Sequence, residues 1–286
     1  MKPSQRPLYA QKIDRVLRHL EGTDLSEIPN SEALAAVAAM SAYHFQRIYR
    51  LMTGETLGDT IKRIRLARAL PELVAQGSVS EATGAAGYAT SQALARALKA
   101  ATGHTASDIR GNAEAQGRLE ETLRRPTFTD TPPPTPVEIV AAEPLRLMAV
   151  RNVGAYAELN AAYNHLFEIV FSKWPMEALQ GLYGLPSDDP RFVVDADCVF
   201  EAAIAIDDPA PLEDIHVLEI AGGYYARQRH QGNFDHIYPA VDALYEAVID
   251  AGHQIADMPL YLHYLDDPEE VPEAYQRTDI YLPLIS

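Results

Sequence analysis

The chain has 286 residues, 47% of them hydrophobic, which is typical of two globular domains and excludes a disordered or collagen-like chain. The single cysteine, Cys198, excludes an internal disulfide and a cysteine-based zinc site, so we expect a cytoplasmic protein. No apolar run approaches a membrane span, and the first ten residues have no apolar core of a secretion signal. The formal net charge of −16 argues at first against a nucleic-acid partner.

This charge is divided unevenly along the chain. Residues 1–125 hold 17 Lys/Arg and 13 Asp/Glu, whereas residues 126–286 hold 7 and 27. Five prolines within residues 126–136 mark the same division, because proline favours an extended, semi-rigid backbone. We therefore predict a basic domain over residues 1–115, a proline-rich linker over 116–136 and an acidic domain over 137–286.

The basic domain is predicted to be all-α. A short helix over Ser31 to Ala38 and the turn Ala39–Met40 lead into a second helix with Ser41 as its N-cap. The spacing of Phe45, Ile48, Tyr49 and Met52 gives this second helix one apolar face. Two short helices joined by a tight turn are typical of a helix-turn-helix unit.

The pattern recurs at an offset of 49, with Leu94, Ala97, Leu98 and Ala101 as the apolar face and a connecting helix over Leu57 to Val74 between the copies. A packed helical hairpin is the alternative for a single copy, but the recurrence with basic residues at matching positions favours DNA binding. The side chains expected to contact phosphates and base edges are Tyr43, His44, Gln46, Arg47, Arg50, Gln92, Arg96 and Lys99.

Residues 9–110 resemble the AraC/XylS-type DNA-binding domain. The resemblance depends on Met40–Ser41, Phe45–Gln46–Arg47, Thr53–Gly54–Glu55, Arg65–Leu66–Ala67–Arg68–Ala69, Gly87–Tyr88, Arg96, Gly103 and Ile109–Arg110. It implies two tandem helix-turn-helix units that occupy successive major grooves. The second unit departs from the family pattern, with Leu94 and Leu98 for two phenylalanines and Ala106 for a proline, and Pro71 is expected to kink the connecting helix. We therefore expect the first unit to read bases and the second to contact mainly phosphate.

The acidic domain shows a second duplication, at an offset of 78. Strands are predicted near 137–140, 145–153, 181–184, 198–206, 215–220, 224–230, 260–265 and 279–284, with helices near 157–171 and 234–251. Arg151, Gly154 and Tyr156 match Arg229, Gly232 and Phe234, and four further matches follow along the helices. The sequence thus predicts an α+β domain of two strand–helix–strand–strand modules with a ligand groove between their helices.

Residues 137–286 resemble the GyrI-like effector-binding domain. The matching stretches are Val153–Gly154–Ala155–Tyr156, Asp188–Asp189–Pro190, Ala221–Gly222–Gly223, Arg229–His230–Gln231–Gly232, residues 264–270 and residues 278–284. Sensor members of this family carry a glutamate that balances cationic drugs, and Leu262 stands at that position here. The expected ligand-binding residues are Tyr156, Tyr163, Trp174, Tyr183, Glu201, Tyr261, Leu262, Tyr264 and Tyr281. For each tyrosine the alternative is core packing, and for Glu201 it is a carboxylate at a sheet edge or in solvent.

Motif searches give no warrant for catalysis, a cofactor or a metal site. The sequence lacks a phosphate-binding loop, a zinc-type His-Glu-x-x-His and a Gly-x-Ser-x-Gly elbow. We therefore predict a transcription regulator whose partners are DNA and a small hydrophobic or cationic effector bound between the two modules, with RNA polymerase as a further partner to consider. Two alternatives stay open: a GyrI-like hydrolase of reactive electrophiles that uses Glu201 with Tyr156 or Trp174, and a protein-binding gyrase-inhibitor-like module.

Overall fold

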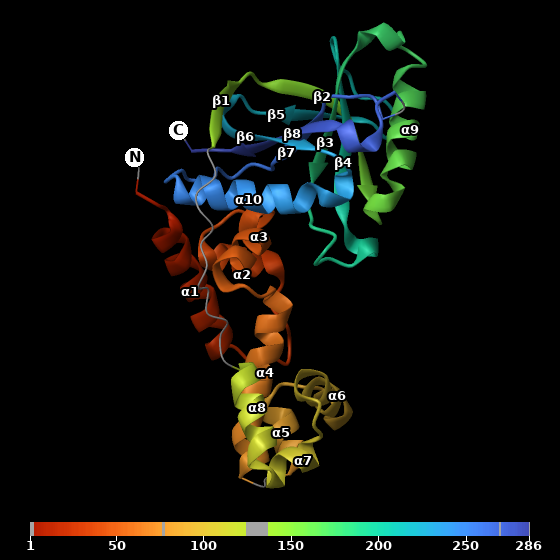
Figure 1. The fold of residues 1–286 in the computed structure, drawn as a ribbon. Helices are drawn as coiled ribbons and strands as arrows, with labels where there is room; N and C mark the ends of the chain where they lie inside the picture. Colours follow the sequence, from red (N-terminus) through yellow and green to blue (C-terminus); the bar gives the residue numbers. More distant parts are fainter. Residues whose placement is uncertain (1–2, 76–77, 124–136, 269, 286) are drawn as a thin grey trace. The chain divides into compact units, whose positions relative to one another are not determined.

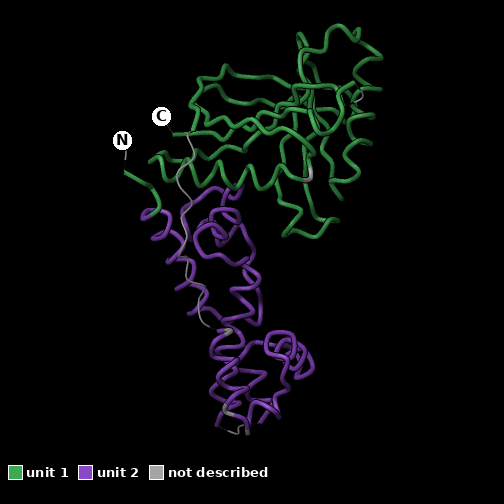
Figure 2. Tube along the Cα trace, in the orientation of Figure 1, with its two compact units in different colours: residues 1–6, 132–286 green, residues 7–131 purple. Residues whose placement is uncertain are grey.

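The computed structural model describes residues 1–286 apart from 1–2, 76–77, 124–136, 269 and 286 (Figure 1). The chain divides into two compact units. What we call the first unit, residues 7–131, is purple and labelled unit 2 in Figure 2, and what we call the second unit, residues 1–6 and 132–286, is green and labelled unit 1. The prolines of the predicted linker lie outside the described residues, so the domain boundaries stay a prediction. Within the described ranges, no helix is long and apolar enough to cross a membrane.

The first unit is helical throughout its described residues, as predicted. Its helices are α1 (Arg6–Gly22, of which Arg6 belongs to the second unit), α2 (Ser31–Ala38), α3 (Ala42–Thr53), α4 (Leu57–Val74), α5 (Val79–Ala85), α6 (Ser91–Thr102), α7 (Ala106–Gly111) and α8 (Ala113–Leu123). The bounds of α2 and α4 are those expected from the sequence. Helix α4 continues through Pro71 to Val74, so Pro71 does not interrupt the connecting helix, and the kink expected there stays a prediction.

The two helix-turn-helix units repeat at the predicted offset of 49. Helices α3 and α6 both have 12 residues, and their N-caps Ser41 and Thr90 accept hydrogen bonds from backbone N–H groups of the first turn. Both helices end at a glycine, Gly54 and Gly103, with a φ of 75°. That left-handed conformation suits glycine, because a side chain would clash there.

Each helix-turn-helix unit has its own apolar core, and helix α4 contributes to both cores. The first core joins α1, α2 and α3 to Ile61 and Ile64, and the second joins α5 to α8 with Leu66 and Leu73. The leucines at positions 94 and 98 are both fully buried in the second core. The second helix-turn-helix is therefore packed like the first, although it lacks the phenylalanines of the family pattern.

The second unit is one curled antiparallel sheet with two long helices. Its strands are β1 (Glu138–Ala142), β2 (Leu145–Val153), β3 (Leu179–Pro186), β4 (Val199–Ile206), β5 (His216–Ile220), β6 (Gly223–Gln231), β7 (Tyr261–Tyr264) and β8 (Arg277–Pro283). The helices are α9 (Leu159–Val170) and α10 (Ile237–Asp250), and α10 lies along β6 and β8 (Figure 1). Short 3-10 turns cover Tyr156–Glu158, Met176–Ala178, Asp195–Asp197, Phe234–His236 and Glu273–Tyr275.

The structure confirms the two duplicated modules. The strand order is β1-β6-β8-β7-β3-β4-β2-β5, so β6, β8 and β7 of one module mirror β2, β4 and β3 of the other, and the modules meet at β7 and β3. Strands β2 and β6, helices α9 and α10, and strands β4 and β8 each begin at the predicted offset of 78 from one another. Even single contacts repeat: the Gly154 N–H donates to Cys198 O and the Gly232 N–H to Gln276 O, both at 2.9 Å.

Candidate functional site

The predicted DNA-contacting side chains lie on helices α3 and α6. Gln92, Arg96 and Lys99 are exposed on α6, and Tyr43 and Gln46 are exposed on α3 with Arg47 and Arg50 half-buried. The Gln46 Nε2 donates to Ser31 Oγ at 3.2 Å, which fixes this amide against α2. His44, which we expected to contact DNA, is 3% exposed and lies in the buried face of α3. It lies one turn before the buried Ile48, which widens the buried face of α3 beyond the four residues of the expected stripe.

Two arginines of α4 stabilise the fold of the first unit. The Arg65 guanidinium donates to the carbonyls of Ala86 and Gly87 after α5, and it lies 4.1 Å from the ring centroid of Tyr88. Arg68 donates to the carbonyls of Leu20 and Glu21 at the end of α1. Both side chains thus satisfy carbonyls at helix ends, a structural reason for the basic motif in this helix.

Five of the nine predicted ligand-binding residues lie on the sheet face that α9 covers. The Tyr156 hydroxyl donates to Val199 O at 2.7 Å, and Tyr163 from α9 donates to Tyr183 O at 2.7 Å. Tyr264 lies edge-on to the rings of Tyr163 and Phe234, at 6.2 and 5.1 Å between centroids. The other two are Trp174, which packs in the same cluster, and Leu262, which is paired with Gly184 where the modules meet.

The other four, Tyr183, Glu201, Tyr261 and Tyr281, lie on the opposite face of the sheet. Tyr261 stacks on Tyr281 at 4.5 Å between ring centroids, and Tyr183 stacks on His263 at the same distance. These tyrosines belong to a core cluster that includes neither α9 nor Trp174. The structure therefore distributes the predicted residues over two faces and does not bring all nine into one groove.

Glu201 has a pseudo-symmetric partner in Asp279, at the matching position of the other module, and each faces an arginine on the neighbouring strand. Asp279 accepts two hydrogen bonds from Arg229, at 2.7 and 2.8 Å. Glu201 lies 3.6 Å from Arg151 and 3.4 Å from His216, so its contacts are looser. Burial raises the pKa of the Glu201 carboxyl, although the charges of His216 and Arg151 act in the opposite direction.

The chemistry available on the α9 face is hydrogen bonding and apolar contact. Burial raises the pKa of the phenols of Tyr156, Tyr163 and Tyr264, so they stay protonated at neutral pH, and the hydroxyls of Tyr156 and Tyr163 already donate to backbone carbonyls. The residues of the hydrolase alternative do not meet, because Glu201 lies on the sheet face opposite Tyr156 and Trp174. No cluster of three or more metal-ligating His, Cys, Asp or Glu side chains occurs among the described residues.

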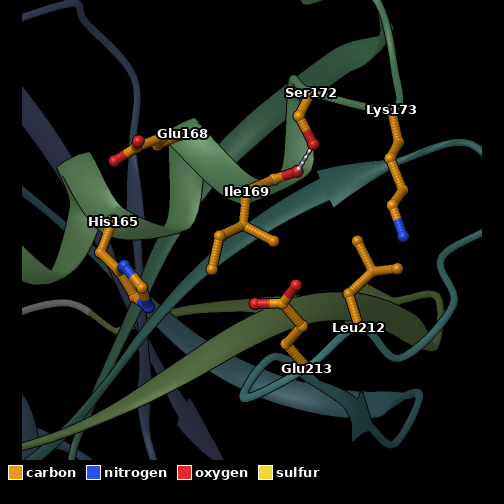
Figure 3. Close-up of a pocket in the computed structure, with 7 residues that line it drawn as sticks. All are labelled: His165, Glu168, Ile169, Ser172, Lys173, Leu212 and Glu213. Atoms are coloured by element: carbon orange, nitrogen blue, oxygen red, sulfur yellow. Dashed lines mark hydrogen bonds between the residues drawn. The ribbon is translucent and has the colours of Figure 1, made fainter.

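A surface pocket of about 320 Å³ lies beside α9, and none of its lining residues is a predicted ligand residue (Figure 3). The side chains in Figure 3 come from α9, its C-terminal turn and the loop before β5, and they are His165, Glu168, Ile169, Ser172, Lys173, Leu212 and Glu213. Ser172 Oγ donates to the carbonyl of Ile169, and the charged side chains are exposed. The pocket is therefore open and polar, unlike the aromatic groove that we expected.

Sequence reasoning did not single out Arg191, in the loop between β3 and β4. Its guanidinium forms ion pairs with Asp189 in the same loop and Asp242 on α10. The contact joins the loop of one module to the helix of the other. Because Arg191 and Asp242 are distant in the sequence and lie in different modules, no local pattern reveals their pairing.

Comparisons with known proteins agree with this architecture. Residues 135–285 match the family model of the GyrI-like small molecule binding domain, and residues 34–112 match a helix-turn-helix domain model. A probable transcriptional regulator, YgiV of Escherichia coli K12, is 30% identical over 105 residues, which are 36% of this chain and 66% of that protein. The alignment thus spans slightly less than two thirds of that relative.

Two solved structures are similar at low identity. The EcmrR–DNA complex has 16% identity and a TM-score of 0.46, with 52% of this chain and 57% of that chain covered. A hydrolase of Listeria innocua has 15% identity and a TM-score of 0.39, with 52% of this chain and 91% of that chain covered. Because the GyrI-like model covers more than half of the sequence, the chain belongs to the GyrI-like small-molecule-binding family, and it carries an AraC-type helix-turn-helix domain before that domain.

Proposed function

We propose that this protein is a ligand-responsive transcription regulator of the cytoplasm. The observation that carries the proposal is the repeat of two capped recognition helices, α3 and α6, at an offset of 49 in a basic unit. Two such helices on one chain suit successive major grooves of DNA. The acidic GyrI-like domain on the same chain supplies a place for an effector.

We place the effector between the two modules, on the sheet face that carries α9. Tyr156, Tyr163, Tyr264 and Trp174 would supply aromatic walls there, and the Leu262 side chain would add apolar surface where β3 and β7 pair. Leu262 offers no carboxylate, so this site suits a neutral hydrophobic compound better than a cation. The other four predicted residues would support the sheet from its opposite face, beneath the effector site; they are Tyr183, Glu201, Tyr261 and Tyr281.

Binding of the effector would shift the regulator between two states that differ in affinity for DNA or for RNA polymerase. A ligand changes this equilibrium only by the difference between its affinities for the two states. The proposal therefore requires that the effector and the partner that distinguishes the two states, DNA or RNA polymerase, alter each other's affinity by the same factor.

Fluorescence anisotropy with a library of promoter fragments tests the DNA-binding part. Arg96→Ala removes an exposed cation of α6, and Arg118→Ala removes an exposed cation of α8 as the matched control. We expect salt-sensitive binding that weakens in the first variant and persists in the second, because each lost phosphate contact lowers the salt slope by about one. Absence of binding at low salt, or equal losses in both variants, would contradict the proposal.

Neither alternative function gains support from a specific observation. The hydrolase would need Glu201 beside Tyr156 or Trp174, and these side chains lie on opposite faces of the sheet. The protein-binding alternative would need a partner surface, and the exposed apolar side chains such as Val153, Met176 and Tyr275 are distributed over separate elements. Copurification of a stable protein partner would favour that alternative.

A further inference from the structure

The side chain of Arg191 occupies a compact cation-binding arrangement between the β3–β4 loop and α10. Its Nε and Nη2 donate to the two oxygens of Asp189 at 2.9 and 2.6 Å. The same Nη2 lies 3.0 Å from Asp242 Oδ2. The guanidinium carbon lies 5.1 Å from the ring centroid of Phe192 and 5.3 Å from that of Tyr238, within the range of cation–π attraction.

These groups are partly removed from water, which strengthens their attraction for a cation. The exposed fraction is 31% for the Arg191 side chain, 13% for Asp189 and 16% for Asp242. Burial alone would lower the pKa of the Arg191 guanidinium, but its hydrogen bonds and charge interactions with the two aspartates outweigh this effect and raise it. The surroundings therefore favour a positive charge.

The loop that carries Arg191 is held in a fixed conformation. The N–H groups of Phe192 and Val193 both donate to the Asp189 carbonyl, and Asp188 accepts the Val199 N–H at 2.9 Å. The same bonds occur at the matching positions of the other module, where Glu270 and Val271 donate to the Asp267 carbonyl and Asp266 accepts the Arg277 N–H. The loop geometry is thus a property of both modules.

The cation-binding groups, by contrast, occur on one side only. At the pseudo-symmetric positions the sequence has Glu269 for Arg191, Glu270 for Phe192, Asn160 for Tyr238 and Asn164 for Asp242. We call Asp189, Asp242, Phe192 and Tyr238 together with the enclosed guanidinium the Arg191 cage. Of these groups, only Asp189 has a counterpart of the same type, Asp267. The second carboxylate and both rings are therefore additions specific to one module, which repetition of the fold does not explain.

We propose that Asp189, Asp242 and Tyr238 form a binding site for a small organic cation with a planar delocalised charge, such as an aromatic guanidinium, which the Arg191 side chain occupies in this structure. The proposal rests on the small-molecule-binding function proposed above but places a second site apart from the effector site on the sheet face that carries α9. A cation that takes the place of Arg191 keeps both carboxylates paired, whereas a neutral molecule supplies no counter-charge. Its arrival would break the Arg191–Asp242 ion pair, one of the contacts between the β3–β4 loop and α10.

Arg191 acts as an internal competitor in this scheme. A tethered group competes as if it were present at millimolar concentration, so an external cation must overcome that advantage in the native chain. Removal of the side chain takes away the cation that pairs with the two carboxylates and faces the Tyr238 ring, and a cation from solution can then take its place. The site can therefore be tested by chemical complementation of the missing guanidinium.

The experiment is calorimetric titration of the full chain with phenylguanidinium and with phenylurea, which has a similar shape and no charge. We expect Arg191→Ala to bind phenylguanidinium at least about tenfold more tightly than the native chain does, since the internal competitor is gone. Adding Asp242→Asn to that variant should weaken binding by about tenfold, because half of the counter-charge is lost. Phenylurea should bind neither variant.

Equal affinity of phenylguanidinium for the native chain and for Arg191→Ala would overturn the proposal, and so would equal binding of phenylurea. Arg191→Gln keeps most of the side-chain length and should behave like the alanine variant, so a folding defect peculiar to one variant cannot decide the outcome. The titration needs no DNA. Failure of DNA binding would therefore overturn the regulator proposal and leave this site standing. Failure of the titration would overturn this site and leave the regulator proposal standing.

Discussion

The junction of the two modules allows a quantitative prediction at Gly184. A Cβ atom at this position would lie 2.4 Å from Phe200 Cζ and 2.7 Å from Tyr264 Oη. Carbon atoms in contact prefer a separation of roughly 3.5 to 4.0 Å, so the Phe200 ring would have to move by more than 1 Å. That ring is 2% exposed and packs edge-on against Tyr156 at 5.2 Å between centroids, which leaves it little room. Gly184→Ala should therefore lower the free energy of unfolding of the second unit by about 1–3 kcal/mol.

Urea unfolding monitored by tryptophan fluorescence would measure this change, because Trp174 is the only tryptophan and packs in the same cluster as Phe200. Adding Phe200→Leu to Gly184→Ala should recover part of the loss, since the smaller side chain relieves the clash. Gly117→Ala in α8 is a control, because a Cβ there meets nothing within 4 Å and the residue belongs to the other unit. An unchanged midpoint in Gly184→Ala, or simple addition of losses in the double variant, would refute the argument.

Three further predictions concern binding and stability. Arg47→Ala should weaken DNA binding more than Arg96→Ala in an anisotropy titration, if the first helix-turn-helix reads bases and the second contacts phosphate, and a reversed order would contradict that division. Leu98→Ala should cost about 2–5 kcal/mol of unfolding free energy, measured by far-UV circular dichroism in urea, because the side chain is fully buried in the second core. For Glu201 the folded-state pKa is raised above the ordinary value of a glutamate, so the native state holds its proton longer than the unfolded state and loses stability as pH rises through that interval. The stability of Glu201→Gln relative to the native chain should therefore increase from acid to neutral pH in urea titrations, and a constant difference would speak against the raised pKa.

The sequence predicted the helices and the two duplications well because those features are local. Cap residues and apolar spacing define where a helix begins and ends, and helices α2 and α4 have the bounds expected from them. The strand β2 likewise covers the predicted residues 145–153. Repetition at fixed offsets then identified the modules, since a duplicated sequence folds to a duplicated structure.

The faces of the strands were harder to predict. Strands buried on both sides lose the alternation of polar and apolar residues that shows which side chains share a face. In β4, Phe200 and Ala202 pack towards α9 while Ala203 and Ala205 pack on the opposite side, and all four are apolar. The sequence therefore grouped Tyr183 and Tyr261 with Tyr163, although the sheet separates them.

Contacts between side chains that are distant in the sequence could not be predicted, for another reason. The arginine at 191 and its partner at 242 have no spacing relation that a helix or hairpin imposes, so their pairing depends on how the loop returns over α10. His44 was misplaced because its burial depends on the width of the buried face of α3 and not on the apolar spacing alone. Both cases concern polar side chains whose surroundings are tertiary, and their residue types do not reveal that.

The duplication separates what the fold requires from what this chain adds. Contacts that recur at an offset of 78, such as the Gly154 and Gly232 hydrogen bonds and the two strand-linking arginine–carboxylate pairs, are explained by the module itself. Where the copies differ, the fold permits more than one solution: Gly184 and Phe200 in one module correspond to Leu262 and Thr278 in the other, a large side chain beside a small one in both cases. None of these four side chains is charged, so packing accounts for the exchange. The Arg191 cage differs in charge as well as in volume, with Glu269 at the position that matches an arginine, so packing alone does not explain it. Departures of this second kind are where we expect ligand recognition to lie in a duplicated domain.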